Sequence, residues 1–164
     1  MNELVNKISS YHIFNYLVPG VIFSYFIDNY FDWPIELIQS NILVAFFIYY
    51  FIGATINRIG SVILLKIIIL IFKIQESPYS DYLEAEKTDP KITILSEINN
   101  MYRSFFSLFF ILLVLSIINL INTYSQFNLF VTIIFLSLLV LYGFSYKKQT
   151  NFIRQRVNNA IKKS

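Results

Sequence analysis

The segment NILVAFFIYYFIGATINRIGSVILLKIIILIFK, residues 41–73, decides the fold. It is almost wholly apolar and contains no proline, so it predicts one long helix. Such a helix would be about 50 Å long, whereas the hydrocarbon core of a bilayer is about 30 Å thick. The segment is therefore too long for a simple crossing. We expect the crossing to end at Asn57 and Arg58, and the helix or a bent continuation of it to emerge beyond them.

The composition is typical of an integral membrane protein. Of the 164 residues, 56% are hydrophobic and only 14% are charged, with a mean hydropathy of +0.59. Soluble domains have about 25% charged residues. The chain has no cysteine, which excludes disulfides, cysteine-ligated zinc and thiol catalysis. We expect an all-α integral membrane protein with four transmembrane helices and no separate enzyme domain.

The apolar runs place the crossings at about residues 11–30, 37–57, 104–124 and 127–146, all within one membrane domain, residues 1–164. Residues 74–103 predict a cytosolic helical segment, in which Ser77-Pro78 and Asp89-Pro90 mark helix starts. Helices 2 and 3 are expected to extend into the cytosol and to form a vestibule there. Residues 147–164 are expected to form a basic cytosolic tail. Its weak apolar stripe, Phe152, Val157, Ala160 and Ile161, predicts a short helix.

The distribution of charge predicts the orientation. With four crossings, all 13 Lys and Arg residues lie on the side of the two termini or at its boundary. The first loop, on the other side, has three acids: Asp28, Asp32 and Glu36. The positive-inside rule makes the basic side cytoplasmic. Because isoleucine, asparagine and lysine are abundant, as in AT-rich bacterial genomes, we expect a multipass protein of the bacterial inner (plasma) membrane.

Polar residues within the apolar runs are the candidates for a pore or gate. Asn15 lies four residues before Pro19, which cannot donate a backbone hydrogen bond and therefore predicts a kink. Asn57 ends the second crossing, and Ser116 and Asn119 form a polar line on the third. Such residues either hold helices together or line water, and both interpretations remain open. Since one four-helix copy has no room for a pore, conduction requires an oligomer.

Basic residues on the cytosolic side are the candidates for binding an anion: Arg58, Lys66, Lys73, Arg103, Lys147, Lys148, Arg154 and Arg156. Lys66 and Lys73 are seven residues apart, so they are predicted to share one helix face. Arg58 is either an anchor that reaches lipid phosphates or a contact for an anionic ligand. The tail attracts either anionic lipid or a polyanion such as an oligonucleotide.

The sequence has no recognisable catalytic or metal-binding motif. His12 is the single histidine and has no partner at metal-ligand or triad spacing, and the acids between Glu76 and Asp89 match no calcium loop. We therefore expect no enzymatic activity, no cofactor and no metal.

Three motifs carry a resemblance to a known group: NYLVPG at residues 15–20, NRIGS at 57–61 and SEINNMYR at 96–103. Together they resemble small bacterial multipass membrane effectors of anti-phage defence, in particular the channel-like effector of the Hailong type. The resemblance implies a homo-oligomeric, tetrameric channel of the inner membrane. It also implies that a DNA oligomer, made by a partner nucleotidyltransferase, keeps the channel silent, and that its release depolarises the cell. It assigns no binding residue.

Two functions from different classes are therefore predicted. The first is an oligomeric ion-channel-like effector, gated by a cytosolic anionic nucleotide or DNA oligomer. The alternative is a non-conducting membrane scaffold that recruits a cytosolic partner through residues 75–100 and the tail. A small-solute transporter is less consistent with the sequence, which has no visible inverted repeat and no intramembrane charge pair.

Overall fold

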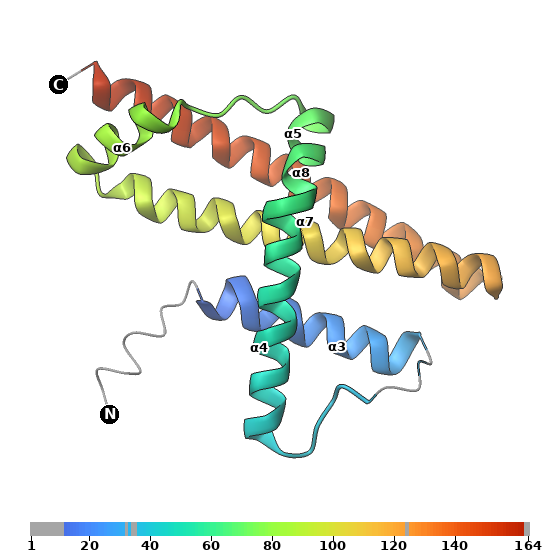
Figure 1. The fold of residues 1–164 in the computed structure, drawn as a ribbon. Helices are drawn as coiled ribbons and strands as arrows, with labels where there is room; N and C mark the ends of the chain where they lie inside the picture. The colour runs from blue at the N-terminus through green and yellow to red at the C-terminus, as the bar shows by residue number, and fades with distance from the viewer. Residues whose placement is uncertain (1–11, 32, 34–35, 124, 163–164) are drawn as a thin grey trace.

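The computed structural model describes residues 12–31, 33, 36–123 and 125–162. Residues 1–11, Asp32 and Lys163, on which parts of the predictions fall, lie outside these ranges. Within the described ranges the chain is helical and has no strand (Figure 1). The elements are η1 (Ile13–Leu17), α3 (Val18–Tyr30), α4 (Ile42–Ile59), η2 (Gly60–Leu64), α5 (Leu65–Phe72), α6 (Tyr79–Thr88), α7 (Lys91–Asn122) and α8 (Gln126–Ile161).

Three helices of the described part are long and apolar enough to cross a membrane: residues 42–72, 91–122 and 126–161. This finding confirms an all-helical fold of membrane type. The predicted first crossing, residues 11–30, is helical from residue 13 as η1 and α3, but it is not one of these three helices. The count of four crossings therefore stays a prediction.

Helices α7 and α8 form a long antiparallel hairpin (Figure 1). The Asp89 side chain accepts a hydrogen bond from the backbone N–H of Lys91 at 3.2 Å, and Ser125 caps α8 in the same way. The hairpin core contains Leu108, Leu112 and Phe135, each at most 1% exposed. Local capping signals and a shared apolar face are sufficient to produce this unit.

The C-terminal segment corrects one prediction. Residues 147–161 continue α8 without a break, and they do not form a separate short helix. Ile153 and Val157 face the protein, whereas Phe152 is 49% exposed and lies outside the buried stripe. The helix continues because the segment contains no proline or glycine and because α6 covers its apolar face.

Helices α4 and α5, joined by η2, run continuously from residue 42 to residue 72, as the opening segment predicts. The second crossing was predicted to start at residue 37, and this start was wrong because α4 begins at Ile42. The Asp28 carboxylate accepts hydrogen bonds from the backbone N–H groups of Leu37 and Ile38, which keeps this stretch outside the helix. Asn41 then caps the helix by accepting from the N–H groups of Leu43 and Val44.

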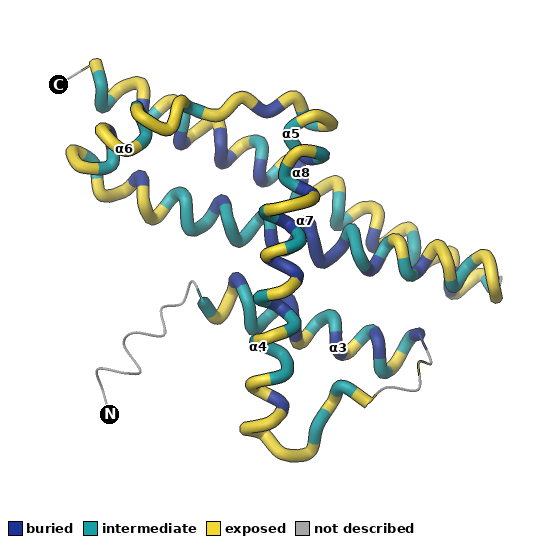
Figure 2. Tube along the Cα trace, viewed as in Figure 1, coloured by how far each residue is buried: buried dark blue, intermediate teal, exposed yellow. Residues whose placement is uncertain are grey.

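This long helix crosses α3 and the α7–α8 hairpin steeply (Figure 1). At the crossing with α3 the two backbones touch, because Gly53 lies against the carbonyl of Tyr16 and Gly20 lies against the carbonyl of Tyr49. Contacts of a steep crossing are confined to a short stretch, so both ends of the helix project beyond their neighbours. Figure 2 shows exposed segments at these ends, where Phe47 is 71% and Leu70 is 78% exposed.

The predicted vestibule between helices 2 and 3 is not formed in this structure. Helix α5 instead ends on α8, where the Phe72 ring packs over Gly143. Along its first part, α7 is bonded to α8 through Asn99 with Thr150 and through the Leu95 carbonyl with Gln149. It bonds to the second helix farther along, where Arg103 donates to Asn57. Two helices that cross steeply meet at one place and cannot act as parallel walls.

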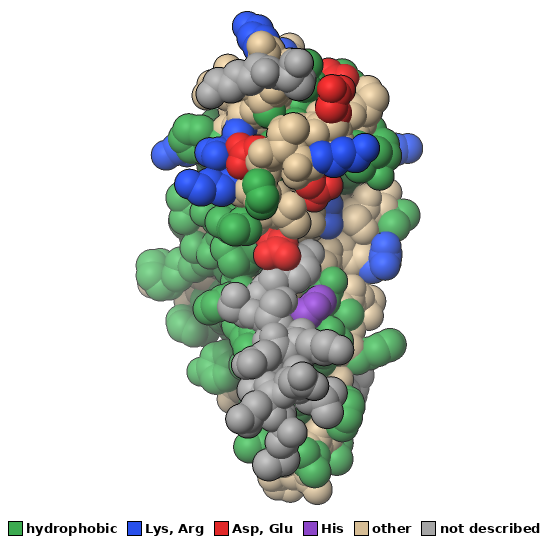
Figure 3. Space-filling view, turned by 90° about the vertical axis from the view of Figure 1, so that its left-hand side faces the viewer, with side chains coloured by type: hydrophobic (Ala, Val, Ile, Leu, Met, Phe, Trp, Pro, Cys, Tyr) green, Lys and Arg blue, Asp and Glu red, His purple; other side chains and the backbone are tan. Residues whose placement is uncertain are grey.

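Helix α6 packs on the hairpin beside residues 91–103 of α7 and 146–161 of α8. Ala85, Ile92, Ile153 and Val157 form a small separate core under it. The helix begins at Tyr79 with Pro78 as its N-cap, one residue later than the predicted cap at Ser77. We call this part of the molecule, formed by α6 and these two stretches, the polar end. Figure 3 shows Lys, Arg, Asp and Glu side chains gathered mainly in the upper half of that view.

Candidate functional site

Polar side chains from three helices meet where η1, α4 and α7 approach one another. Asn15 of η1 is 0% exposed and accepts a hydrogen bond from the Ser104 hydroxyl of α7. Arg103 Nη2 donates to Asn57 Oδ1 of α4 at 3.3 Å. We call these four residues the polar junction. The junction brings together the predicted inner ends of the first, second and third crossings.

Two nitrogen atoms of the junction are buried without an acceptor. They are Nδ2 of Asn15 and Nε of Arg103. A buried donor that makes no hydrogen bond costs about 1–3 kcal/mol. The junction is therefore less stable than an apolar contact of the same shape would be, which is typical of a site retained for function rather than for stability.

Both π-helical turns of the chain's described part lie at the junction. Pro19 lacks an N–H, and the turn before it widens so that the N–H of Val18 bonds to the carbonyl of Ile13. This confirms the predicted distortion near Asn15. The second π-helical turn, η2, directly follows Arg58 and Ile59. Such turns occur frequently at functional sites because they displace side chains from regular helical positions.

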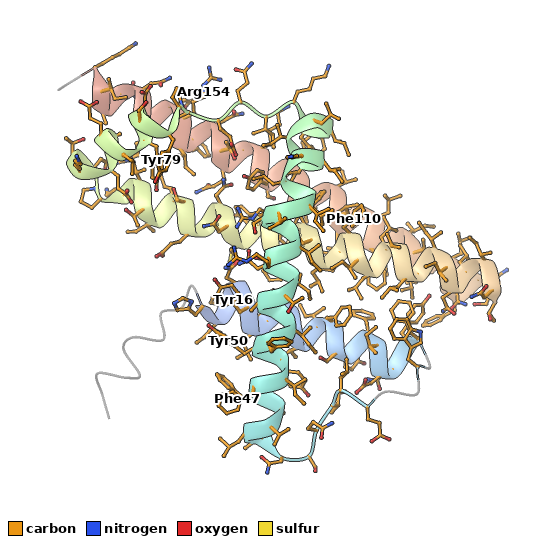
Figure 4. The ribbon with its side chains drawn as sticks, viewed as in Figure 1. Tyr16, Phe47, Tyr50, Tyr79, Phe110 and Arg154 are labelled. Carbon is orange, nitrogen blue, oxygen red and sulfur yellow. The ribbon has the colours of Figure 1, made fainter. Side chains whose placement is uncertain are left out.

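A cleft of about 590 Å³ opens at the polar end between α6, α7 and α8. Its polar lining comes from all three helices: Tyr79, Tyr82, Ser96, Asn99, Asn100, Arg103, Tyr146, Thr150 and Arg154. Figure 4 labels Tyr79 and Arg154 at this end of the molecule. Asn99 Nδ2 donates to Thr150 Oγ1 at 3.0 Å and fixes α7 to α8 along the cleft wall.

The charges in the cleft are predominantly positive. Arg103 and Arg154 line it together with one acid, Glu76, which accepts a hydrogen bond from the Tyr146 hydroxyl at 3.2 Å. Tyr79 is 75% exposed and offers a ring face on which a base can stack. One arginine guanidinium can donate two parallel hydrogen bonds to two oxygens of the same phosphate. The cleft thus has the chemistry for an anionic ligand that also carries an aromatic group.

Arg103 connects the cleft with the junction. Its side chain lines the cleft and also a second, smaller hollow on the other side, beside Tyr16, Asn57 and Arg58. The Arg103 side chain therefore lines the cleft and also bonds to Asn57 in the junction. A ligand that draws Arg103 toward the cleft would weaken its hydrogen bond to Asn57.

The structure divides the predicted anion-binding residues among several places. Arg156 pairs with Asp89 and holds α6 to α8, and its guanidinium beside Asp89 lowers the pKa of that carboxyl. Lys73 has a left-handed backbone, with φ of 50°, and ends α5. The shared helix face of Lys66 and Lys73 was therefore wrong.

Lys147 and Lys148 lie on an outer face of α8, away from the cleft. They line a shallow hollow of about 410 Å³ with Phe144 and Phe152. The Lys148 ammonium is 5.9 Å from the centre of the Phe152 ring. This face combines apolar rings with positive charge, which is typical of the boundary between hydrocarbon and headgroups.

The structure does not bring Ser116 and Asn119 to the junction. They lie near the far end of α7, and the buried Ser116 hydroxyl donates to the Leu113 carbonyl of its own helix at 2.9 Å. Sequence reasoning missed Ser104, which completes the junction. A serine in an apolar helix most often bonds to its own backbone, so only the neighbouring Arg103 could have drawn attention to it.

The three motifs that carry the predicted resemblance converge here. NYLVPG contributes Asn15, NRIGS contributes Asn57, and SEINNMYR contributes Arg103. No protein-family model, curated protein or solved structure matches the chain. The resemblance to the Hailong effector therefore stays a prediction. Within the described ranges, no three acidic, histidine or cysteine side chains come together to hold a metal ion.

Proposed function

We propose that this protein is an oligomeric ion-channel-like effector of the bacterial inner membrane. In this proposal a cytosolic anionic ligand, a nucleotide or DNA oligomer made by a partner enzyme, gates it. Opening depolarises the membrane as part of anti-phage defence. The observation that carries the proposal is the position of Arg103, which lines the cleft and bonds to Asn57 in the junction.

The charge pattern supports a cytoplasmic polar end. Residues 104–146, which form the far part of the hairpin, contain no charged side chain. Arg103 and Lys147 directly flank this uncharged stretch at the polar end. The positive-inside rule then assigns the polar end to the cytoplasm. A soluble ligand would reach the cleft from that side.

The exposed apolar surface supports an assembly of copies. The long helix α4–α5 projects beyond its neighbours with exposed side chains at both ends, among them Phe47, Phe51, Leu70 and Ile71. Lipid and adjacent copies of the chain are the partners that suit such a surface in a membrane. A tetramer would contain four copies of the junction, one in each chain.

The proposed gating follows from the junction's contacts. An anionic ligand in the cleft would attract the Arg103 guanidinium through hydrogen bonds in which donor and acceptor are both charged, whereas Asn57 offers only a neutral acceptor. The bond to Asn57 would weaken, and the fit between α4 and α7 at the junction would change. In the proposed channel, this change sets the state of the gate.

The test is the membrane potential of bacteria that express the chain without its ligand. We expect depolarisation by the wild type and a changed response for Asn15→Leu, which removes the junction's buried amide. Lys66→Gln is the control, because Lys66 is exposed and lies outside the cleft and the junction. An unchanged potential in cells and in liposomes, together with a stable complex with a cytosolic protein, would refute the channel hypothesis. It would instead support a non-conducting membrane scaffold.

A further inference from the structure

The described residues that line the smaller hollow beside the junction include two positively charged ones and no acidic one. Its volume is about 210 Å³, and it is lined by Tyr16, Ala54, Asn57, Arg58, Ser61 and Arg103. Two arginine side chains, from α4 and α7, thus line one hollow. The only ion pair that the described residues form is Arg156 with Asp89, so neither arginine of the hollow is paired with a carboxylate there.

This arrangement favours the binding of an anion. Two like charges at one site repel each other, and Nε of Arg103 is buried without an acceptor. A tetrahedral oxyanion supplies several acceptors at once and matches the planar fork of guanidinium groups. Asn57 satisfies only one of the Arg103 donors, through the bond at 3.3 Å.

Size and position restrict the class of ligand. Pockets for drug-sized molecules have volumes of about 300–1,000 Å³, and this hollow is smaller. It lies where the charged polar end meets the uncharged residues 104–146, which corresponds to the level of lipid headgroups. A headgroup-sized anion suits it better than a nucleotide does.

We propose that the hollow binds a phosphate group between Arg58 and Arg103. The group belongs either to an anionic phospholipid or to free inorganic phosphate, since both present the same oxygens. Bound there, the phosphate group offsets with its negative charge the repulsion between the two arginine side chains and ties α4 to α7 at the place where the long helix crosses the hairpin. The inference does not depend on channel activity, because it concerns binding alone.

The experiment measures thermal unfolding of the purified full chain in dodecyl maltoside micelles. One arm adds sodium phosphate against sodium chloride of equal ionic strength, and the other adds phosphatidylglycerol against the micelle alone. We expect stabilisation in at least one arm, and the arm that responds identifies the source of the phosphate. For Arg58→Gln we expect roughly tenfold or greater weakening of that response, from the loss of a charged hydrogen-bond donor.

The matched control is Lys66→Gln, which removes the same charge from the same long helix outside the hollow. It should respond as the wild type does. Arg58 is exposed, so its replacement should leave the fold intact. Equal weakening in both variants would show general charge attraction and overturn the proposal. Lack of stabilisation in both arms for the wild type would also overturn it.

Discussion

The contact between Gly53 and Tyr16 determines how closely the long helix can cross η1 and α3. A Cβ atom on Gly53 would collide with the carbonyl of Tyr16, which belongs to the backbone and cannot rotate away. Alanine is favoured over glycine inside a helix by about 0.8–1.0 kcal/mol. Overpacking costs about 1–3 kcal/mol, and a rigid backbone neighbour places this case near the upper limit. Gly53→Ala should therefore destabilise the fold by about 2 kcal/mol.

The assay is equilibrium unfolding of the purified protein in detergent, with Thr55→Ala as the control. Thr55 is exposed on the same helix, and its hydroxyl donates to the Phe51 carbonyl of that helix at 2.9 Å. The control should change the free energy of unfolding by less than about 0.5 kcal/mol. If Gly53→Ala were as stable as the wild type or more stable, helix propensity would dominate and the close crossing would be refuted.

Three further predictions concern the junction and α6. Asn15→Leu combined with Ser104→Ala should change the free energy of unfolding by less than about 1 kcal/mol, because the lost hydrogen bond is offset by removal of the unpartnered amide; a large destabilisation in chemical unfolding would contradict this. Ile92→Ala, at a fully buried position under α6, should cost about 2–5 kcal/mol and accelerate proteolysis within residues 79–88; unchanged cleavage would show that the small core does not hold α6. The hydrogen bond from Arg156 and, further, Lys91 lower the pKa of Asp89, so its value in the folded protein is below that in the unfolded one. The pair therefore stabilises the fold at neutral pH. This contribution is lost as the pH falls below about 4. The difference in melting temperature between the wild type and Asp89→Asn should therefore shrink on acidification, and a constant difference would argue against the ion pair.

Local signals in the sequence predicted the helices themselves well. The Asp89-Pro90 pair marked the start of α7 to within a residue, and the absence of proline and glycine breaks predicted its length. The uninterrupted apolar segment predicted the helix from residue 42 to residue 72. These features depend on capping, on proline geometry and on hydrophobic runs, all of which act over a few residues.

Packing between the helices was not predictable from the same signals. A helix that is apolar on all sides does not indicate which face meets a neighbour, so the steep crossing of α4–α5 was missed. The glycines were the available clue, since Gly20 and Gly53 lie where backbones touch. In the tail, Phe152 was assigned to the apolar stripe, whereas the buried residue is Ile153. An error of one residue in such an assignment turns the predicted helix face by about 100°.

The candidate site was predicted in part. Asn15, Asn57, Arg58 and Arg103 were selected from the sequence, and the structure brings all four to one region. The pairing of Arg103 with Asn57 joins residues far apart in the chain, which periodicity cannot reveal. The cleft depends on the docking of α6 against α8, which is also a tertiary feature.

Ion flux through liposomes that contain the purified full chain tests the central claim most directly. The wild type should conduct alone, and a short single-stranded DNA oligomer on the side of the polar end should suppress the flux. In Arg103→Gln the flux should no longer depend on the oligomer, because the link between cleft and junction is removed. A wild-type protein that stays monomeric and conducts neither with nor without the oligomer would contradict the account.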